Sequence, residues 1–112
     1  MNWINLDNSR QLNEIIRLSE TRAQVIFKHS TRCATSSLAK NRLEKKVPPS
    51  GVDFYFLDLI RERDLSDKIA SEFNICHESP QVLLIRKGEC IYEESHNGIQ
   101  MEEINEQVQM AR

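Results

Sequence analysis

Apolar residues along the chain form short continuous runs separated by segments with helical spacing. The continuous runs, which are typical of buried strands, cover residues 2–6, 23–30 and 52–60. In residues 52–60 large side chains occupy both alternating positions, so we expect a strand that is buried on both faces inside a sheet. Residues 80–95 predict two more strands, because the lysine–glycine pair at 87–88 leaves room only for a hairpin turn.

Between these runs, apolar residues recur every three or four positions, which indicates amphipathic helices. Four helices are predicted, at residues 7–20, 35–46, 65–73 and 101–112. The second of them is polar but rich in helix formers, and the prolines and glycine that follow it end it.

The predicted order of elements is β-α-β-α-β-α-β-β-α. Alternating strands and helices imply parallel strands covered by helices, and the final hairpin adds antiparallel strands. The order is that of the thioredoxin fold, an α/β fold with a central mixed sheet of about five strands flanked by helices. With 112 residues and no linker of low complexity, the chain is expected to form one domain over residues 1–112.

Charge and hydropathy exclude two classes of partner. The chain has 15 Lys and Arg against 17 Asp and Glu, and it therefore lacks the basic field that nucleic-acid binding needs. No apolar stretch approaches the roughly 18 residues that span a bilayer, and the first residues do not resemble a signal peptide. We therefore expect a cytoplasmic protein that binds neither nucleic acid nor membrane.

Three cysteines, Cys33, Cys76 and Cys90, are too few and too widely spaced for a disulfide framework. At least one thiol is therefore expected to be free. His77 and His96 do not form ligand pairs with the spacing of zinc motifs, so no metal site is expected.

Cys33 lies where the second predicted strand meets the second predicted helix. At that place the amides of the first helical turn and the positive end of the helix dipole stabilise a thiolate over a thiol. Lys28, Arg32 and His29 are expected to add positive charge nearby, although the place of His29 at a strand end fits a structural hydrogen bond equally well. The position therefore favours a nucleophile for thiol–disulfide exchange.

The segment Cys33, Ala34, Thr35, Ser36 has the spacing of a CxxC redox motif with serine in place of the second cysteine. Ser36 can donate a hydrogen bond to the Cys33 thiolate, but it cannot resolve a mixed disulfide. A second thiol must therefore come from elsewhere, most simply from a small molecule. The alternative interpretation is an inert buried cysteine.

Ser79 and Pro80 precede the fourth predicted strand, where a thioredoxin fold carries a cis-proline loop that faces the active-site sulfur. In such a loop the backbone of the residue before the proline can pair with a substrate chain. We therefore predict a cis bond between Ser79 and Pro80 and a substrate contact at both residues.

Three segments together carry a family resemblance: FKHSTRCATSS, LDLIRERDLSDKIASEF and HESPQVLLIRKGE. In order and spacing they resemble the YtxJ-type monothiol bacilliredoxins, which are thioredoxin-fold proteins of bacteria that make bacillithiol. The resemblance implies that Cys33 removes bacillithiol from mixed disulfides on client proteins and is then released by another low-molecular-weight thiol. It also implies bacillithiol as co-substrate and no tightly bound cofactor.

The resemblance extends to residues around the cysteine. It implies that Cys33 and Ser36 are catalytic, and substrate contacts are expected at Thr31, Arg32, Ala34, Ser79 and Pro80. Ala34 departs from the family pattern, which commonly has proline after the nucleophile.

Two other functions stay open from the sequence. One is a dithiol or glutaredoxin-like reductase that uses Cys33 and Cys76, and the other is a non-catalytic thioredoxin-fold binding module. The expected form of the protein is a monomer or a weak dimer.

Overall fold

The computed structural model describes residues 1–112 and contains every predicted element in the predicted order. The strands are β1 (Trp3–Asn5), β2 (Ala23–His29), β3 (Val52–Asp58), β4 (Gln81–Arg86) and β5 (Glu89–Ser95). The helices are α1 (Ser9–Leu18), α2 (Ala34–Glu44), α3 (Arg63–Phe73) and α4 (Met101–Met110), with a short 3₁₀ turn, η1 (His96–Gly98), before α4. None of these helices is both long enough and apolar enough to cross a bilayer.

Several elements are shorter than the apolar pattern predicts, because local polar contacts end them. Helix α1 begins at Ser9 because the Asn8 side chain accepts a hydrogen bond from the Gln11 amide at 3.0 Å and so caps the helix. Strand β3 ends at Asp58, whose carboxylate accepts from the Ile60 amide at 3.0 Å and so starts a turn.

The five strands form one mixed sheet in the order β1-β3-β2-β4-β5. Strands β1, β3 and β2 are parallel, whereas β4 runs antiparallel to β2 and β5 antiparallel to β4. β2 is the central strand, and all seven of its residues are buried. β3 lies inside the sheet as predicted, between β1 and β2.

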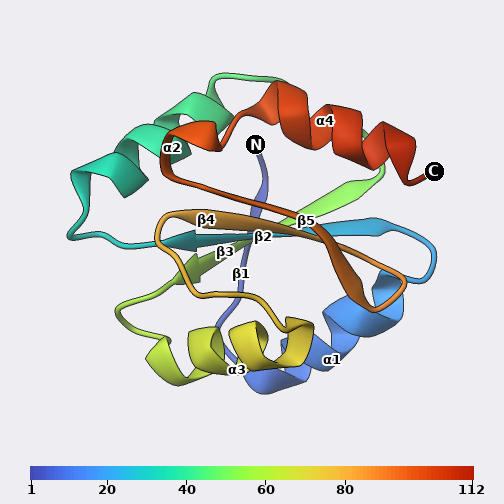
Figure 1. Ribbon diagram of the computed structural model, residues 1–112, viewed down its shortest axis with the longest axis horizontal. Helices are drawn as coiled ribbons and strands as arrows, with labels where there is room; N and C mark the ends of the chain where they lie inside the picture. Colours follow the sequence, from blue (N-terminus) through green and yellow to red (C-terminus); the bar gives the residue numbers. More distant parts are fainter.

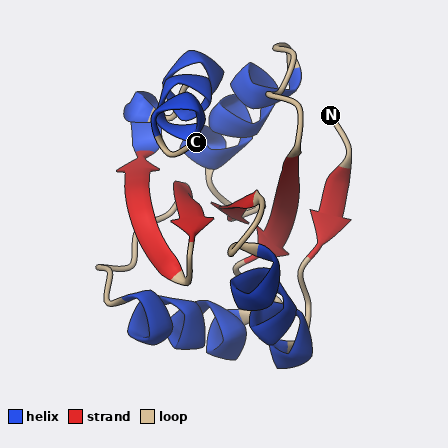
Figure 2. Cartoon of the chain, turned by 90° about the vertical axis from the view of Figure 1, so that its right-hand side faces the viewer, coloured by secondary structure: helices blue, strands red, loops and turns tan.

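Helices cover both faces of the sheet (Figures 1 and 2). Helices α2 and α4 lie on one face, and α1 and α3 lie on the other. Each face has its own apolar core: Phe27 of β2 packs with Leu43 of α2 and Ile104 of α4, while Ile26 packs with Leu12 of α1 and Ile69 of α3. Neighbouring residues of β2 therefore enter different cores, as strand geometry requires.

The topology brings two distant segments together at one end of β2. The carboxyl end of β2 leads into the amino end of α2, and the antiparallel pairing with β4 sets Lys28 opposite Gln81. The residues that precede Gln81, including Pro80, therefore lie beside the turn between β2 and α2. This is the end of the molecule where the sequence predicts the site.

Candidate active site

Cys33 occupies the capping position of α2. Its backbone is extended, with φ −115° and ψ 117°, and its carbonyl accepts the first hydrogen bond of the helix from the Ser37 amide at 3.1 Å. The Cys33 side chain makes no capping hydrogen bond and is half-buried. The sulfur therefore belongs to the positive end of an 11-residue helix, where the amides of the first turn favour an anion.

The residues next to Cys33 are open to solvent. Thr31 and Arg32 form an exposed turn, and Ala34, the first residue of α2, is also exposed. A hydrogen bond closes this turn: the Ser30 carbonyl accepts from the Cys33 amide at 3.2 Å. A macromolecule could therefore reach the predicted contact residues without any displacement of the core.

Ser36 is fully buried on the inner face of α2, three residues after Cys33. Its hydroxyl accepts from the Ser30 amide at 3.0 Å and lies 2.7 Å from Nδ1 of His29. The structure contains no hydrogen bond between Ser36 and Cys33. The Ser36 hydroxyl therefore does not bind the Cys33 sulfur, contrary to the sequence prediction. It is bound instead by His29 of β2 and by Ser30 of the turn that follows.

His29, at the end of β2, is only 5% exposed. Its ring packs against Phe27 and Phe56, with centroids 5.7 and 5.2 Å away. Burial, and then the positive charge of Lys40, lower the pKa of His29, and these effects outweigh the opposing pull of Asp58. The ring is therefore neutral near pH 7 and adds no positive charge to the site, in contrast to one of the two roles considered for it.

Lys28 points to the opposite face of the sheet. Its ammonium group donates to the Ser66 carbonyl of α3 at 3.1 Å and lies 3.4 Å from Nδ1 of His77. Burial lowers the pKa of Lys28 to about 8, against a smaller opposing effect of Asp67. The prediction that Lys28 adds charge beside Cys33 is wrong, because consecutive residues of a strand point to opposite faces.

The Ser79–Pro80 peptide bond is cis, which confirms the sequence prediction. Pro80 is buried, and its carbonyl accepts from the His96 amide at 3.1 Å. By contrast, neither the N–H nor the carbonyl of Ser79 takes part in a backbone hydrogen bond, and its buried hydroxyl has no partner. The Ser79 backbone and hydroxyl thus have unused hydrogen-bonding capacity.

Polar side chains that sequence reasoning did not select hold the loop before Pro80 in place. Gln81 donates to the Cys76 carbonyl at 3.0 Å, and its side-chain oxygen accepts from the Glu78 amide at 3.4 Å. The Glu78 carboxylate in turn lies 3.4 Å from Nε2 of His96. The one signal in the sequence for this role is a glutamine at the start of an apolar run, and the structure buries it fully.

The other two cysteines differ from Cys33 and from each other. Cys76 is exposed on the loop before Pro80, whereas Cys90 is half-buried on β5 and donates to the Tyr92 carbonyl at 3.3 Å. Burial raises the pKa of Cys90 to about 11. All three thiols are free, and no group of three or more His, Cys, Asp or Glu side chains is arranged to hold a metal ion.

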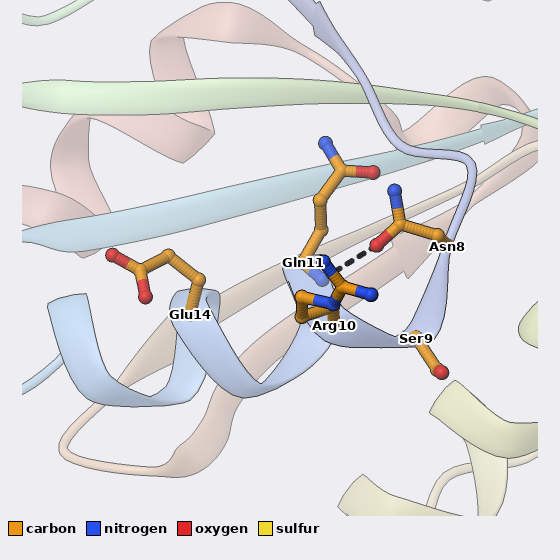
Figure 3. A pocket seen from close by; sticks show the side chains of 5 residues that line it. All are labelled: Asn8, Ser9, Arg10, Gln11 and Glu14. Carbon is orange, nitrogen blue, oxygen red and sulfur yellow. Dashed lines mark hydrogen bonds between the residues drawn. The ribbon is translucent and has the colours of Figure 1, made fainter.

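A polar surface pocket lies elsewhere, at the amino end of α1 (Figure 3). Its lining consists of five residues without a hydrophobic side chain: Asn8, Ser9, Arg10, Gln11 and Glu14. None of them belongs to the Cys33 turn or to the Pro80 loop. The hydrogen bond that Figure 3 shows joins the Gln11 amide to the Asn8 side chain and caps α1.

The solved structures that this chain resembles include a candidate oxidoreductase and two thioredoxins. A candidate oxidoreductase with a thioredoxin fold is 32% identical, with a TM-score of 0.80 over 92% of this chain and 90% of that one. Thioredoxin from Malassezia sympodialis is 12% identical, with a TM-score of 0.75 over 98% and 90% of the two chains. Thioredoxin from Trypanosoma brucei brucei is 13% identical, with a TM-score of 0.74 over 97% and 89%. The two thioredoxins establish the fold alone.

A thiol at a helix amino end beside a cis-proline loop, on a sheet of this topology, defines a thiol–disulfide oxidoreductase of the thioredoxin fold. The family model of the monothiol bacilliredoxin BrxC matches residues 4–104. The chain belongs to this family, and its chemistry is therefore related to bacillithiol.

Proposed function

We propose that Cys33 removes bacillithiol from mixed disulfides on client proteins. The Cys33 thiolate attacks the bacillithiol sulfur, a Cys33–bacillithiol disulfide forms, and the client leaves as a thiolate. A second low-molecular-weight thiolate then attacks the same bacillithiol sulfur, which releases Cys33 and carries the bacillithiol away in a small disulfide. Each step exchanges one S–S bond for another, and the low-molecular-weight thiol is the reductant that the cycle consumes.

The observation that carries this proposal is the chemistry at position 36. Ser36 is fully buried, and its hydroxyl is held between the Ser30 amide and His29. A hydroxyl in this position cannot attack a disulfide on Cys33, and the Cys33 adduct therefore persists until a thiol arrives from solution. The arrangement supports a monothiol cycle in which bacillithiol is co-substrate and no cofactor is tightly bound.

The loop before Pro80 offers a binding site for the client backbone. The free N–H and carbonyl of Ser79 can pair with an extended client backbone, as in strand addition. Thr31, Arg32 and Ala34 are exposed next to the cysteine and would contact the client side chains around its disulfide. The proposal further includes a cytoplasmic protein of one domain, residues 1–112, that acts as a monomer or weak dimer.

A transfer assay with single-cysteine variants tests the proposal. With a bacillithiolated client and excess low-molecular-weight thiol, Cys33→Ser should abolish catalysed release of the client thiol. Cys76→Ser and Cys90→Ser are the matched controls and should retain it. Loss of release in Cys76→Ser would favour the dithiol alternative, and the absence of catalysed release in the wild type would favour a binding module.

A further inference from the structure

Lys28 is the only lysine or arginine of β2, and the exchange steps do not use it. Its side chain is fully buried, and burial lowers its pKa to about 8, so its charge weakens the fold at pH 7. Stability alone therefore does not account for a lysine at this position. The contacts of the ammonium group, rather than its effect on stability, indicate what it does.

The ammonium group of Lys28 connects α3 to the loop before Pro80. It donates to the Ser66 carbonyl of α3 at 3.1 Å and lies 3.4 Å from Nδ1 of His77, while the Ser66 hydroxyl lies 3.5 Å from the same nitrogen. Because an ammonium group has hydrogens and no lone pair, Nδ1 is the acceptor, and the proton of the neutral ring is on Nε2. Lys28 therefore bonds at the same time to a helix and to a residue of the loop.

The loop of residues 76–79 depends on such side-chain contacts, because it has no backbone–backbone hydrogen bond of its own. Gln81 bonds to the two peptide groups that flank His77, and Lys28 bonds to the His77 ring between them. Lys28 and Gln81 are partners in the register of β2 and β4, so both contacts start from the same place in the sheet. Two buried side chains of the sheet therefore fix the residues that lead to Ser79.

We propose that Lys28 is a positioning residue for client binding: its ammonium group fixes the His77 side chain against α3 and thereby places the Ser79 backbone for the client. Lys28 is fully buried and therefore acts through His77 rather than on the client itself. The inference rests on the proposed contact between Ser79 and the client backbone, and it names the group that keeps this contact in place. Loss of the bond between Lys28 and His77 should weaken client binding and leave the reactivity of Cys33 toward small reagents unchanged.

Two substitutions of the exposed His77 separate the acceptor from the bulk of the ring. His77→Asn retains an acceptor in the place of Nδ1, since the amide oxygen is likewise attached to Cγ, whereas His77→Leu has none. With a short bacillithiolated peptide, the KM of His77→Leu should rise about two- to tenfold, the range for loss of one hydrogen bond, while that of His77→Asn stays near the wild-type value. Alkylation of Cys33 by iodoacetamide should be equally fast in all three proteins. An unchanged KM in His77→Leu, an equal rise in both variants, or a matching loss of Cys33 alkylation would overturn the proposal.

NMR of the protein without a client tests the contact separately from the transfer chemistry. The charged groups that act on the His77 ring are Lys28 of β2, Arg63 and Asp67 of α3, and Glu78 of the loop. Burial and then the charge of Lys28 lower the pKa of His77, so the ring should titrate at a higher pH in Lys28→Met than in the wild type. Lys68→Met, at an exposed lysine of α3, is the control and should leave this titration unchanged.

The same spectra report the mobility of the loop. Backbone order parameters of residues 76–79 should fall in Lys28→Met and stay at the wild-type values in Lys68→Met, because only Lys28 bonds to the loop. An unchanged His77 titration or unchanged order parameters in Lys28→Met would overturn the proposal. Because these measurements need no client, a failure of the proposed transfer and a failure of this inference remain distinguishable.

Discussion

At the scale of single residues, the three thiols show how the surroundings of a cysteine determine its chemistry. Cys33 is half-buried at a helix amino end, whereas Cys90 is held in a strand with its sulfur directed at a carbonyl. The first environment favours the thiolate, and the second raises the pKa of the thiol to about 11. The two sulfur atoms therefore have different surroundings, and we expect Cys33 to be the more reactive of the two.

We predict that Cys33 is alkylated faster by iodoacetamide at pH 7 than Cys76, by about two- to fivefold, because the helix end stabilises its thiolate. Cys90 should react at least about tenfold more slowly than either, since burial suppresses its thiolate. Peptide mass spectrometry after timed alkylation gives the three rates. Equal rates for all three cysteines would contradict the assignment of the nucleophile.

The neighbours Lys28 and His29 are both buried, on opposite faces of β2, and burial lowers the pKa of both. For Lys28 the pKa falls from 10.5 to about 8, so between these values the unfolded chain binds more protons than the folded one. Stability therefore rises with pH across this window, and the contribution of Lys28 is unfavourable below it.

Substitution of Lys28 by methionine isolates this contribution. From pH 8 to 10.5 the free energy of unfolding of the wild type should rise relative to that of Lys28→Met. Urea unfolding at several pH values measures the difference, and Lys68→Met, at an exposed lysine of α3, is the control that should follow the wild type. Parallel curves for wild type and Lys28→Met would show that the amine is not buried in the folded state.

At the scale of elements, we expect the free amides at the amino end of α2 to affect the reactivity of the Cys33 thiol. Ala34 is the first residue of α2, and Cys33 before it has an extended backbone. That conformation is compatible with a following proline, and proline is favoured at the first helical position. Ala34→Pro can therefore remove one amide next to the sulfur while the helix is preserved.

We predict that Ala34→Pro slows alkylation of Cys33 at pH 7 by about two- to fivefold, because the helix end loses part of its stabilisation of an anion, about 0.3–1 kcal/mol. Ala34→Gly retains the amide and should leave this rate close to that of the wild type. An equal change in both variants would mean that helix stability, rather than the amide, is responsible.

Sequence periodicity predicted the elements of this fold because each face of the sheet is buried under its own helices. It could not predict which face each residue of β2 occupies, since all seven are buried and the run contains no alternation. The sequence therefore placed the Lys28 side chain on the wrong face of the sheet. It also left the hydrogen-bond partner of His29 undetermined. The contact of His29 with Ser36 joins the end of a strand to the next helix, and no local spacing rule specifies such a contact.

At the scale of the whole molecule, the sheet separates two cores, and only one of them lies beneath α2. Leu12 of α1 belongs to the opposite core and is fully buried. Its truncation should weaken the fold without a change at the site, because α1 and α2 cover different faces (Figure 1).

Leu12→Ala should lower the free energy of unfolding by about 2–5 kcal/mol. At temperatures where the variant is folded, its rate of Cys33 alkylation should match that of the wild type. Leu38→Ala, at a leucine that is 61% exposed, is the control and should cost less than about 0.5 kcal/mol. A large change in Cys33 reactivity in Leu12→Ala would show that the two faces are coupled.

The central claim is that Cys33 acts alone, and intact-mass spectrometry of a stalled reaction tests it most directly. The protein is incubated with a bacillithiolated client and no added thiol, and the products are then separated and weighed. We predict one bacillithiol on Cys33 and an equal amount of reduced client, because Ser36 cannot expel the adduct. A Cys33–Cys76 disulfide with released bacillithiol, or no adduct at all, would contradict this account.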